Sequence, residues 1–147
     1  MRRIFVAAAL VVLSAGCYAD TFSYPGTPAT SGTDTGIVGA YSLQTVNGSV
    51  LPYTYFQSGA DSYVVVSDTV VIAASGSWTE SWHERRTVGG TVTTPAFSDR
   101  GTYTVNGSDV TFASQAGGTS TGSFGNGTLN WPVQFGTGPF LPAVYTK

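Results

Sequence analysis

The stretch Ser77-Trp-Thr-Glu-Ser-Trp-His-Glu-Arg-Arg-Thr87 concentrates the side chains of this sequence that can do chemistry. It holds carboxylates, guanidinium groups, an imidazole and two indoles. If the stretch is a β-strand, alternate side chains point to opposite faces. One face then gathers both indoles, both carboxylates and one guanidinium group: Trp78, Glu80, Trp82, Glu84 and Arg86. Side chains of these types are better suited to binding a ligand than to catalysing a reaction.

Three interpretations of this face stay open. If it lines the interior of a barrel, the indoles and the Glu–Arg set bind an amphipathic ligand through apolar contact and a few polar groups. Trp131 shares that cavity if it also points inward. If the face looks outward, Trp78 and Trp82 form a patch for a partner or a sugar. In the third interpretation the indoles fill the core near one end and the charges lie beyond the rim, in water.

Catalytic and metal-binding patterns are weak by comparison. Gly118-Thr-Ser-Thr-Gly122 matches the G-x-S-x-G elbow of hydrolases, which needs a strand-to-helix turn and a later acid and His. Neither an acidic residue nor a His follows Ser120. His83 is the only His and Cys17 the only Cys, so no zinc site can be assembled from such ligands. We expect no catalytic residue, no metal, no cofactor and no enzymatic activity.

The composition indicates an all-β fold that positions these residues. Only 10% of the 147 residues are charged, while Gly, Ser, Thr, Val and aromatics are abundant. Alternating stretches between Gly101 and Phe135 are interrupted by Asn106-Gly107 and Asn126-Gly127, and Asn47-Gly48 ends an earlier one. Asn-Gly between alternating stretches predicts a tight hairpin in which both residues have positive φ.

The spacing of strands and turns predicts an antiparallel up-and-down β-barrel of about eight to ten short strands over residues 37–147. We expect Ser77–Val88 to be the longest strand and Leu129 to Phe135 to be one alternating strand. Ser67-Asp68 is expected to separate two strands, and Pro52 to make its surroundings irregular. Closure into a barrel removes exposed strand edges.

Residues 1–16 have the layout of a secretory signal peptide, with a basic start, an apolar run and small residues. The run, Ile4 to Leu13, is too short to span a bilayer as a helix. Residues 17–36 are rich in Thr, Ser, Gly and Pro and predict a flexible linker. Without the two arginines of the signal peptide, four basic residues face eight acidic ones, a net charge of −4 that does not suit nucleic-acid binding.

Ser14-Ala15-Gly16-Cys17 resembles the bacterial lipobox, which implies a lipid anchor on Cys17. The usual pattern has Leu three residues before the Cys, where this chain has Ser14. The alternative is ordinary signal cleavage near Ala15 or after Ala19. Because Cys17 has no second Cys to pair with, lipidation is the favoured prediction. Several acyl chains on one Cys would hold the protein firmly to a membrane.

Several short motifs resemble the bacterial lipocalin-like domain family. They are Ala40 to Pro52, Gly76-Ser-Trp78, Gly101 to Val105, Val110-Thr-Phe112, Gly122 to Leu129 and the final Val-Tyr-Thr-Lys. The resemblance covers about residues 37–147 and implies a small exported β-barrel, often a lipoprotein, with an apolar ligand in the barrel mouth. It implies no particular ligand residue.

The sequence therefore predicts a membrane-anchored lipoprotein of the bacterial cell envelope, facing the periplasm or the cell surface. Its lipocalin-like barrel is expected to bind a small apolar or amphipathic ligand through Trp78, Glu80, Trp82, Glu84, Arg86 and Trp131. The alternative is a solid-packed structural or interaction module of the envelope that has no small-molecule ligand.

Overall fold

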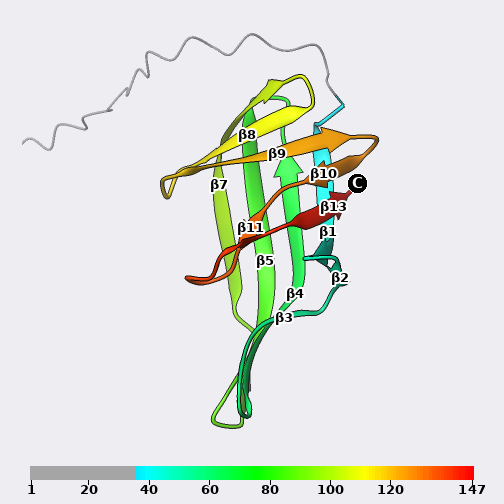
Figure 1. Cartoon of the computed structure of the whole chain (residues 1–147). Coiled ribbons are helices and arrows are strands. Elements are labelled where there is room, and N and C mark those ends of the chain that lie inside the picture. The colour runs from blue at the N-terminus through cyan, green and yellow to red at the C-terminus, as the bar shows by residue number, and fades with distance from the viewer. Residues whose placement is uncertain (1–35) are drawn as a thin grey trace, which may run out of the picture.

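A computed structural model describes residues 36–147 (Figure 1). The predicted signal peptide (1–16), Cys17 and the predicted linker up to residue 35 lie outside the described residues. Within the described range there are strands and no helix. The strands are β1 (Gly39–Val46), β2 (Ser49–Val50), β3 (Tyr53–Ser58), β4 (Asp61–Ile72), β5 (Ser77–Val88), β6 (Thr91–Thr93), β7 (Ala96–Asn106), β8 (Asp109–Ser114), β9 (Thr119–Gly125), β10 (Thr128–Asn130), β11 (Val133–Gln134), β12 (Phe140–Leu141) and β13 (Ala143–Thr146). None of residues 36–147 belongs to a helix long and apolar enough to cross a membrane.

Eight strands close into an antiparallel barrel. The order is β1-β13-β10-β9-β8-β7-β5-β4, and β4 returns to β1. Tyr41 of β1 lies opposite Val70 of β4, and Leu43 lies opposite Tyr145 of β13. Most neighbours in the barrel are consecutive along the chain, and the remaining short strands are excursions between them. The predicted all-β, up-and-down barrel is therefore confirmed.

The strands β4 and β5 extend beyond the barrel. Each has twelve residues. Only Thr69–Ile72 of β4 pair with β1, while Asp61–Val65 pair with β3. Similarly, β5 pairs with β7 up to His83 and with β6 at its end. The result is a four-stranded ribbon, β3-β4-β5-β6, that projects below the barrel in Figure 1. The bounds of β5 match the predicted Ser77–Val88.

The predicted break at Ser67-Asp68 is wrong, because β4 runs continuously through it. Val65 lies opposite Glu84 and Asp68 opposite Trp82, so three steps on β4 match two steps on β5. The extra residue is a β-bulge, which changes the side to which later side chains point. Asp68 consequently points inward, and only 3% of its surface is exposed.

The tight turns follow the Asn-Gly signals with one exception. Asn47-Gly48 and Asn126-Gly127 have positive φ at both residues (50° and 78°, 53° and 75°), as a type I′ hairpin requires. At the third signal, Asn106 still pairs with Asp109, so the loop is Gly107-Ser108. Only Gly107 has positive φ there, which fits a type II′ turn. The predicted hairpin is present, with its loop displaced by one residue.

The predicted strand from Leu129 to Phe135 is broken. The strand β10 ends at Asn130, and β11 pairs with β12 in a separate two-stranded sheet. Pro132 lies between them and cannot donate a ladder hydrogen bond. The expected alternation of burial is nevertheless present, because Leu129, Trp131, Val133 and Phe135 are all buried.

The packed core lies inside the barrel. It includes Tyr41, Val70, Ile72, Phe112 and Leu129. A glycine permits the tightest approach within it, because a Cβ on Gly101 would lie 1.8 Å from the carbonyl oxygen of Ala113 and 2.9 Å from Nε1 of Trp78. Strand β7 therefore passes close to Trp78, whose Nε1 donates to the carbonyl of Thr102 (3.1 Å).

Candidate functional site: an acidic, aromatic-lined cavity

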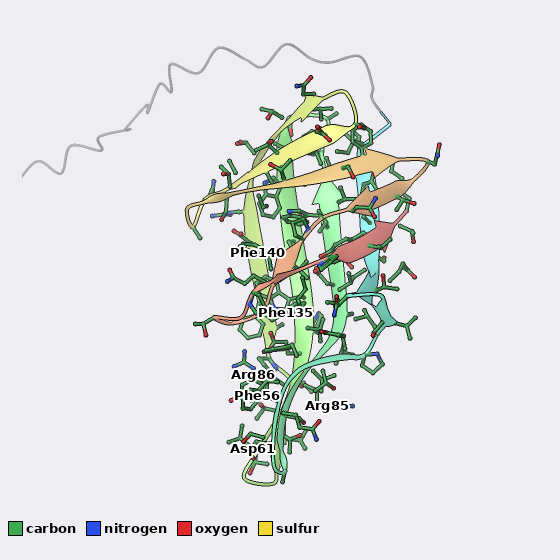
Figure 2. The ribbon with its side chains drawn as sticks, viewed as in Figure 1. Phe56, Asp61, Arg85, Arg86, Phe135 and Phe140 are labelled. Atoms are coloured by element: carbon green, nitrogen blue, oxygen red, sulfur yellow. The ribbon has the colours of Figure 1, made fainter. Side chains whose placement is uncertain are left out.

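A cavity of about 290 Å³ opens between the barrel wall and the segment that carries β11 and β12. The inward face of β5 forms one side of it with Trp78, Glu80 and Trp82. Trp131 and Phe135 face these residues from the segment around β11. Figure 2 marks Phe135 and Phe140 in this region, above Phe56, Arg86 and Asp61 of the ribbon. The cavity thus lies where the barrel meets the ribbon.

The aromatic side chains at the cavity form two groups, one around Trp78 and Trp131 and one around Trp82. The rings of Trp78 and Trp131 meet edge to face with centroids 5.3 Å apart, and Phe112 lies 4.4 Å from Trp131. The indole of Trp131 donates to Oγ of Ser120 at 2.7 Å. Trp82 stacks on Phe97 at 5.2 Å. Each indole is fixed by a ring neighbour, and the indoles of Trp78 and Trp131 also donate hydrogen bonds within or beside the core.

Asp68 and Glu80 form a carboxyl pair in the cavity wall. Oδ2 of Asp68 accepts a hydrogen bond from the hydroxyl of Tyr145 (2.7 Å), a residue on the neighbouring part of the barrel. Oδ1 of Asp68 has no donor among the described residues when both carboxyls are ionised. It gains one when Glu80 is protonated and donates to Asp68. The two groups therefore share one proton.

The electrostatics of the pair favour that protonated state. Burial, followed by the negative charge of Asp68, raises the pKa of Glu80 to about 9. Burial also raises the pKa of Asp68, although the hydrogen bonds from Tyr145 and Glu80 oppose this. Burial raises the pKa of Tyr145 well above its ordinary value, so its hydroxyl remains a donor. Glu80 is therefore the carboxyl that holds a proton at neutral pH.

A third carboxylate lies next to the pair. Asp99 of β7 stands opposite Glu80 of β5 and also lines the cavity. Its Oδ1 accepts hydrogen bonds from Oγ of Ser114 (2.9 Å) and from the backbone N–H of Arg100 (2.7 Å). The charge of Asp99 contributes to the raised pKa of Glu80. The polar wall of the cavity is therefore acidic on three adjacent strands.

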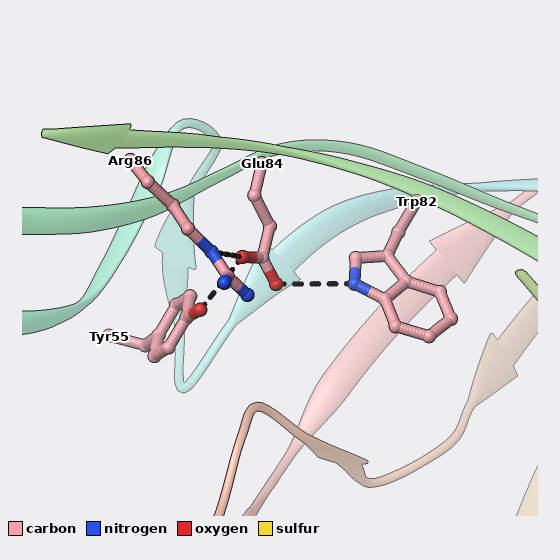
Figure 3. A network of polar contacts seen from close by, with 4 residues as sticks. All are labelled: Tyr55, Trp82, Glu84 and Arg86. Carbon is pink, nitrogen blue, oxygen red and sulfur yellow. Dashed lines mark hydrogen bonds and ion pairs between the residues drawn. The ribbon is translucent and has the colours of Figure 1, made fainter. Parts of the chain in front are cut away.

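Glu84 is the centre of a separate network at the edge of the cavity (Figure 3). Its Oε2 accepts from the hydroxyl of Tyr55 (2.8 Å) and from Nε of Arg86 (2.7 Å), and its Oε1 accepts from Nε1 of Trp82 (3.2 Å). The guanidinium of Arg86 lies 5.1 Å from the ring centres of Tyr63 and Phe97. The network joins β3 to β5 and holds the indole of Trp82 in place.

The structure brings four of the six residues predicted for the site to one cavity: Trp78, Glu80, Trp82 and Trp131. Glu84 and Arg86 share the inward face of β5 but bind each other and do not line the cavity. The surface-patch interpretation does not fit, because 2% of Trp78 is exposed. Glu84 is not solvated beyond the rim either, since 3% of it is exposed.

Sequence reasoning missed Asp68, Asp99 and Tyr145. The sequence does contain a sign of Asp68, because this residue lies two positions before Val70 and four before Ile72. In a strand the three side chains point to the same face, which is buried. The pattern was obscured by the bulge upstream. Asp99 lies at alternate positions from Phe97 and Tyr103, so it points to the same face of β7 as they do. Nothing in the sequence indicates that Tyr145 reaches Asp68, because the two are 77 residues apart.

Residues considered for catalysis or metal binding lie elsewhere. Ser120 lies within strand β9, not at a strand-to-helix elbow, and accepts the indole hydrogen bond of Trp131. His83 is on the outward, exposed face of β5. Among residues 36–147, no group of three or more His, Cys, Asp or Glu side chains is arranged to hold a metal ion. Comparisons with protein-family models, curated proteins and solved structures gave no match.

Proposed function

We propose that the protein is an exported, lipid-anchored barrel that binds a small apolar or amphipathic molecule in this cavity. The observation that carries the proposal is a cavity with three indoles in its lining and a few buried polar groups on one wall. Such a combination is typical of small-molecule sites. A volume of about 290 Å³ is at the low end of the roughly 300–1,000 Å³ of such sites, which favours a compact ligand.

The cavity weighs against the alternative of a solid-packed structural module. Side chains are able to fill the interior of a barrel with eight strands completely. Here Tyr41, Val70 and Leu129 are fully buried, whereas free volume remains beside Glu80 and Trp82. A solid-packed module would fill this volume with side chains.

We further propose that the protein binds its ligand without transforming it. This is supported by the position of the two groups that a hydrolase would need. The hydroxyl of Ser120 is occupied by the indole of Trp131, and His83 lies on the other side of the barrel wall. The anchor on Cys17 and the place in the bacterial envelope rest on the sequence alone.

Native mass spectrometry of the full chain extracted from membranes tests the proposal. We expect the mass of a diacylated or triacylated Cys17, together with a small-molecule adduct that dissociates on activation. Trp82→Ala removes an indole from the cavity and should lose most of the adduct. His83→Ala, its neighbour on the exposed face, should retain it.

A different result contradicts each part of the proposal. An unacylated mature chain that begins after Ala15 or Ala19 overturns the lipid anchor. If wild type and Trp82→Ala carry the same adduct, the ligand lies outside the cavity. If wild type never carries a small molecule and binds none from a panel of apolar and amphipathic compounds, the solid-packed module is the better description.

A further inference from the structure

The charged groups that line the cavity all have the same sign. Asp68, Glu80 and Asp99 contribute carboxyls from β4, β5 and β7, and no Lys, Arg or His lies among the described lining residues. The guanidinium of Arg86 is bound to Glu84, that of Arg100 is bound to Oε1 of Gln115, and neither residue lines the cavity. A ligand with a carboxylate or phosphate would therefore meet negative charge without a cation to pair with.

Asp68 adds an acceptor to this wall that depends on a proton of Glu80. It is buried with 3% exposed, and Oδ1 has no donor other than a protonated Glu80. An ionised carboxylate only accepts hydrogen bonds, and a buried one is stabilised by charged donors. The arrangement thus calls for a ligand that brings N–H donors and positive charge into the cavity.

The opposite wall suits the rest of such a ligand. The indoles of Trp78, Trp82 and Trp131 line the same space as the carboxyls. Indole rings attract cations through their π faces, most strongly where water is excluded, and they also bury apolar groups. An ammonium group next to the carboxyls would place an attached apolar body against these rings.

We propose that the cavity selects a compact amphipathic amine, whose ammonium group replaces the shared proton between Asp68 and Glu80 and whose apolar body packs on the tryptophans. This inference rests on the proposed function and specifies its ligand class. The exchange balances: the ammonium ion enters with its three N–H donors, and the proton held by Glu80 leaves to solvent. Both carboxyls are then ionised and paired with one cation.

The exchange makes binding dependent on pH. The groups that face Glu80 are Asp68 on β4 and Asp99 on β7, and Tyr145 on β13 donates to Asp68. Tyr145 stays protonated, so the proton that leaves is that of Glu80. An aliphatic ammonium group keeps its own proton up to about pH 10. The affinity for the amine should therefore rise between about pH 6 and pH 9, since Glu80 loses its proton more easily there.

A matched series of three compounds tests the charge preference: 2-phenylethylamine, 2-phenylethanol and 3-phenylpropanoate. They share an apolar body and differ in charge. Isothermal titration calorimetry of the purified full chain at neutral pH should give an affinity for the amine about tenfold or more above that for the alcohol. The propanoate should bind more weakly than the alcohol. Titrations in buffers of different ionisation enthalpy should show proton release with the amine alone.

The double variant Asp68→Asn, Glu80→Gln removes the charges and keeps the shapes. It should lose the preference for the amine and bind the alcohol within about twofold of wild type. Alcohol binding thereby shows that the variant is folded. Asp109→Asn removes an exposed carboxyl at a hairpin tip and should behave as wild type. If the double variant does not fold, the inference is still tested by the proton release and the pH dependence of amine binding in the wild type.

The outcomes distinguish this inference from the function on which it rests. Equal affinity for amine and alcohol, or tightest binding of the propanoate, overturns the amine inference and leaves a binding cavity in place. Amine binding without proton release also overturns it, because the shared proton would then not be displaced. If none of the three compounds binds and no adduct is seen by native mass spectrometry, the binding function itself is wrong.

Discussion

The carboxyls of Asp68 and Glu80 lie in the wall of the cavity beside the indoles of Trp78 and Trp82. A buried charge is costly unless it is paired or neutralised. Here the cost is lowered in two ways: Tyr145 donates to Asp68, and Glu80 takes up a proton. The charge of the pair therefore depends on pH and on what occupies the cavity. Glu84 differs, because both of its carboxylate oxygens already accept hydrogen bonds.

The raised pKa of Glu80 predicts a pH dependence of stability. Glu80 binds its proton more tightly in the folded chain, with a pKa of about 9, than at its ordinary value of 4.5. Its stabilising contribution is complete below about pH 4.5 and is lost as the pH rises towards 9. In this window the unfolding free energy should fall by at most about 1.4 kcal/mol per pH unit through this group.

Urea denaturation at several pH values measures this effect as the difference in unfolding free energy between the wild type and Glu80→Gln. Glu80→Gln keeps a donor for Asp68 and does not titrate, so its stability should decline less with pH than that of wild type. Asp109→Asn, which changes an exposed carboxyl, should follow the wild-type curve. Parallel curves for wild type and Glu80→Gln would show that Glu80 does not hold a proton in the fold.

At the scale of single residues, alternation along β5 was sufficient to predict that Trp78, Glu80 and Trp82 share an inward face. The period of two in a strand fixes faces without any knowledge of partners. Alternation did not predict that Glu84 and Arg86 would bind each other, because side-chain rotamers decide that. It also missed Asp68, since a bulge shifts the parity of β4 and no residue type marks it.

Among the strands, β7 depends most on the absence of a side chain. Gly101 stands opposite Trp78 on one side and Ser114 on the other. A Cβ there would collide with the backbone of Ala113, which cannot move as a flexible side chain would. The glycine is thus needed for the distance between β7 and β8, and for the position of the indole that lines the cavity.

Gly101→Ala should consequently be strongly destabilising. We expect a loss of about 3 kcal/mol or more, at the upper end of overpacking effects, because a backbone atom must move. Gly125→Ala is the matched control, since Gly125 is also in a strand but has open space around its Cα and should change stability by about 0.5 kcal/mol or less. Thermal unfolding followed by circular dichroism compares the two. Similar melting temperatures would contradict the close approach.

Turn chemistry predicted the elements better than strand continuity did. Asn47-Gly48 and Asn126-Gly127 form the expected turns because a type I′ turn requires positive φ at both positions, which Asn and Gly tolerate. The break at Pro132 and the pairing of β11 with β12 were not predicted. They depend on contacts between Val133 and Leu141 and between Gln134 and Phe140, which alternation alone does not specify.

In the whole molecule, closure of the barrel depends on β13. This short strand lies between β1 and β10, so it joins the two ends of the described chain into one sheet. It also supplies Tyr145, which is fully buried and bonded to Asp68. The sequence predicted a closed barrel from strand number and from the need to remove edges, but not which strands meet.

Deletion of residues 143–147 should therefore open the barrel. Both β1 and β10 would become edges, and the hydroxyl bond to Asp68 would be lost. We expect loss of cooperative unfolding and much weaker hydrogen-exchange protection in β1 and β10. A synthetic peptide of residues 139–147 should restore protection by adding the missing strand. Full protection in the deleted chain would show that β13 is dispensable for closure.

The lipocalin-like resemblance remains a prediction. The closed antiparallel barrel is compatible with the fold that it implies. No comparison with known proteins supports or excludes the family, and the lipid anchor lies outside the described residues. The sequence predicted that the inward face of β5 could line a cavity, but not the cavity's size or its wall of Asp68 and Asp99, because free volume depends on how β11 and β12 lie against the barrel.

The placement of the indoles has an optical consequence. The chain has three Trp, and all of them line the cavity beside Asp68 and Glu80. The tryptophan emission of the protein therefore reports on the contents of that cavity and not on the tips of the ribbon. Because Trp78 and Trp131 are in edge contact, their transitions are coupled, and a ligand that separates the two rings would register as a change in the near-ultraviolet dichroism. No external label is needed to observe the site.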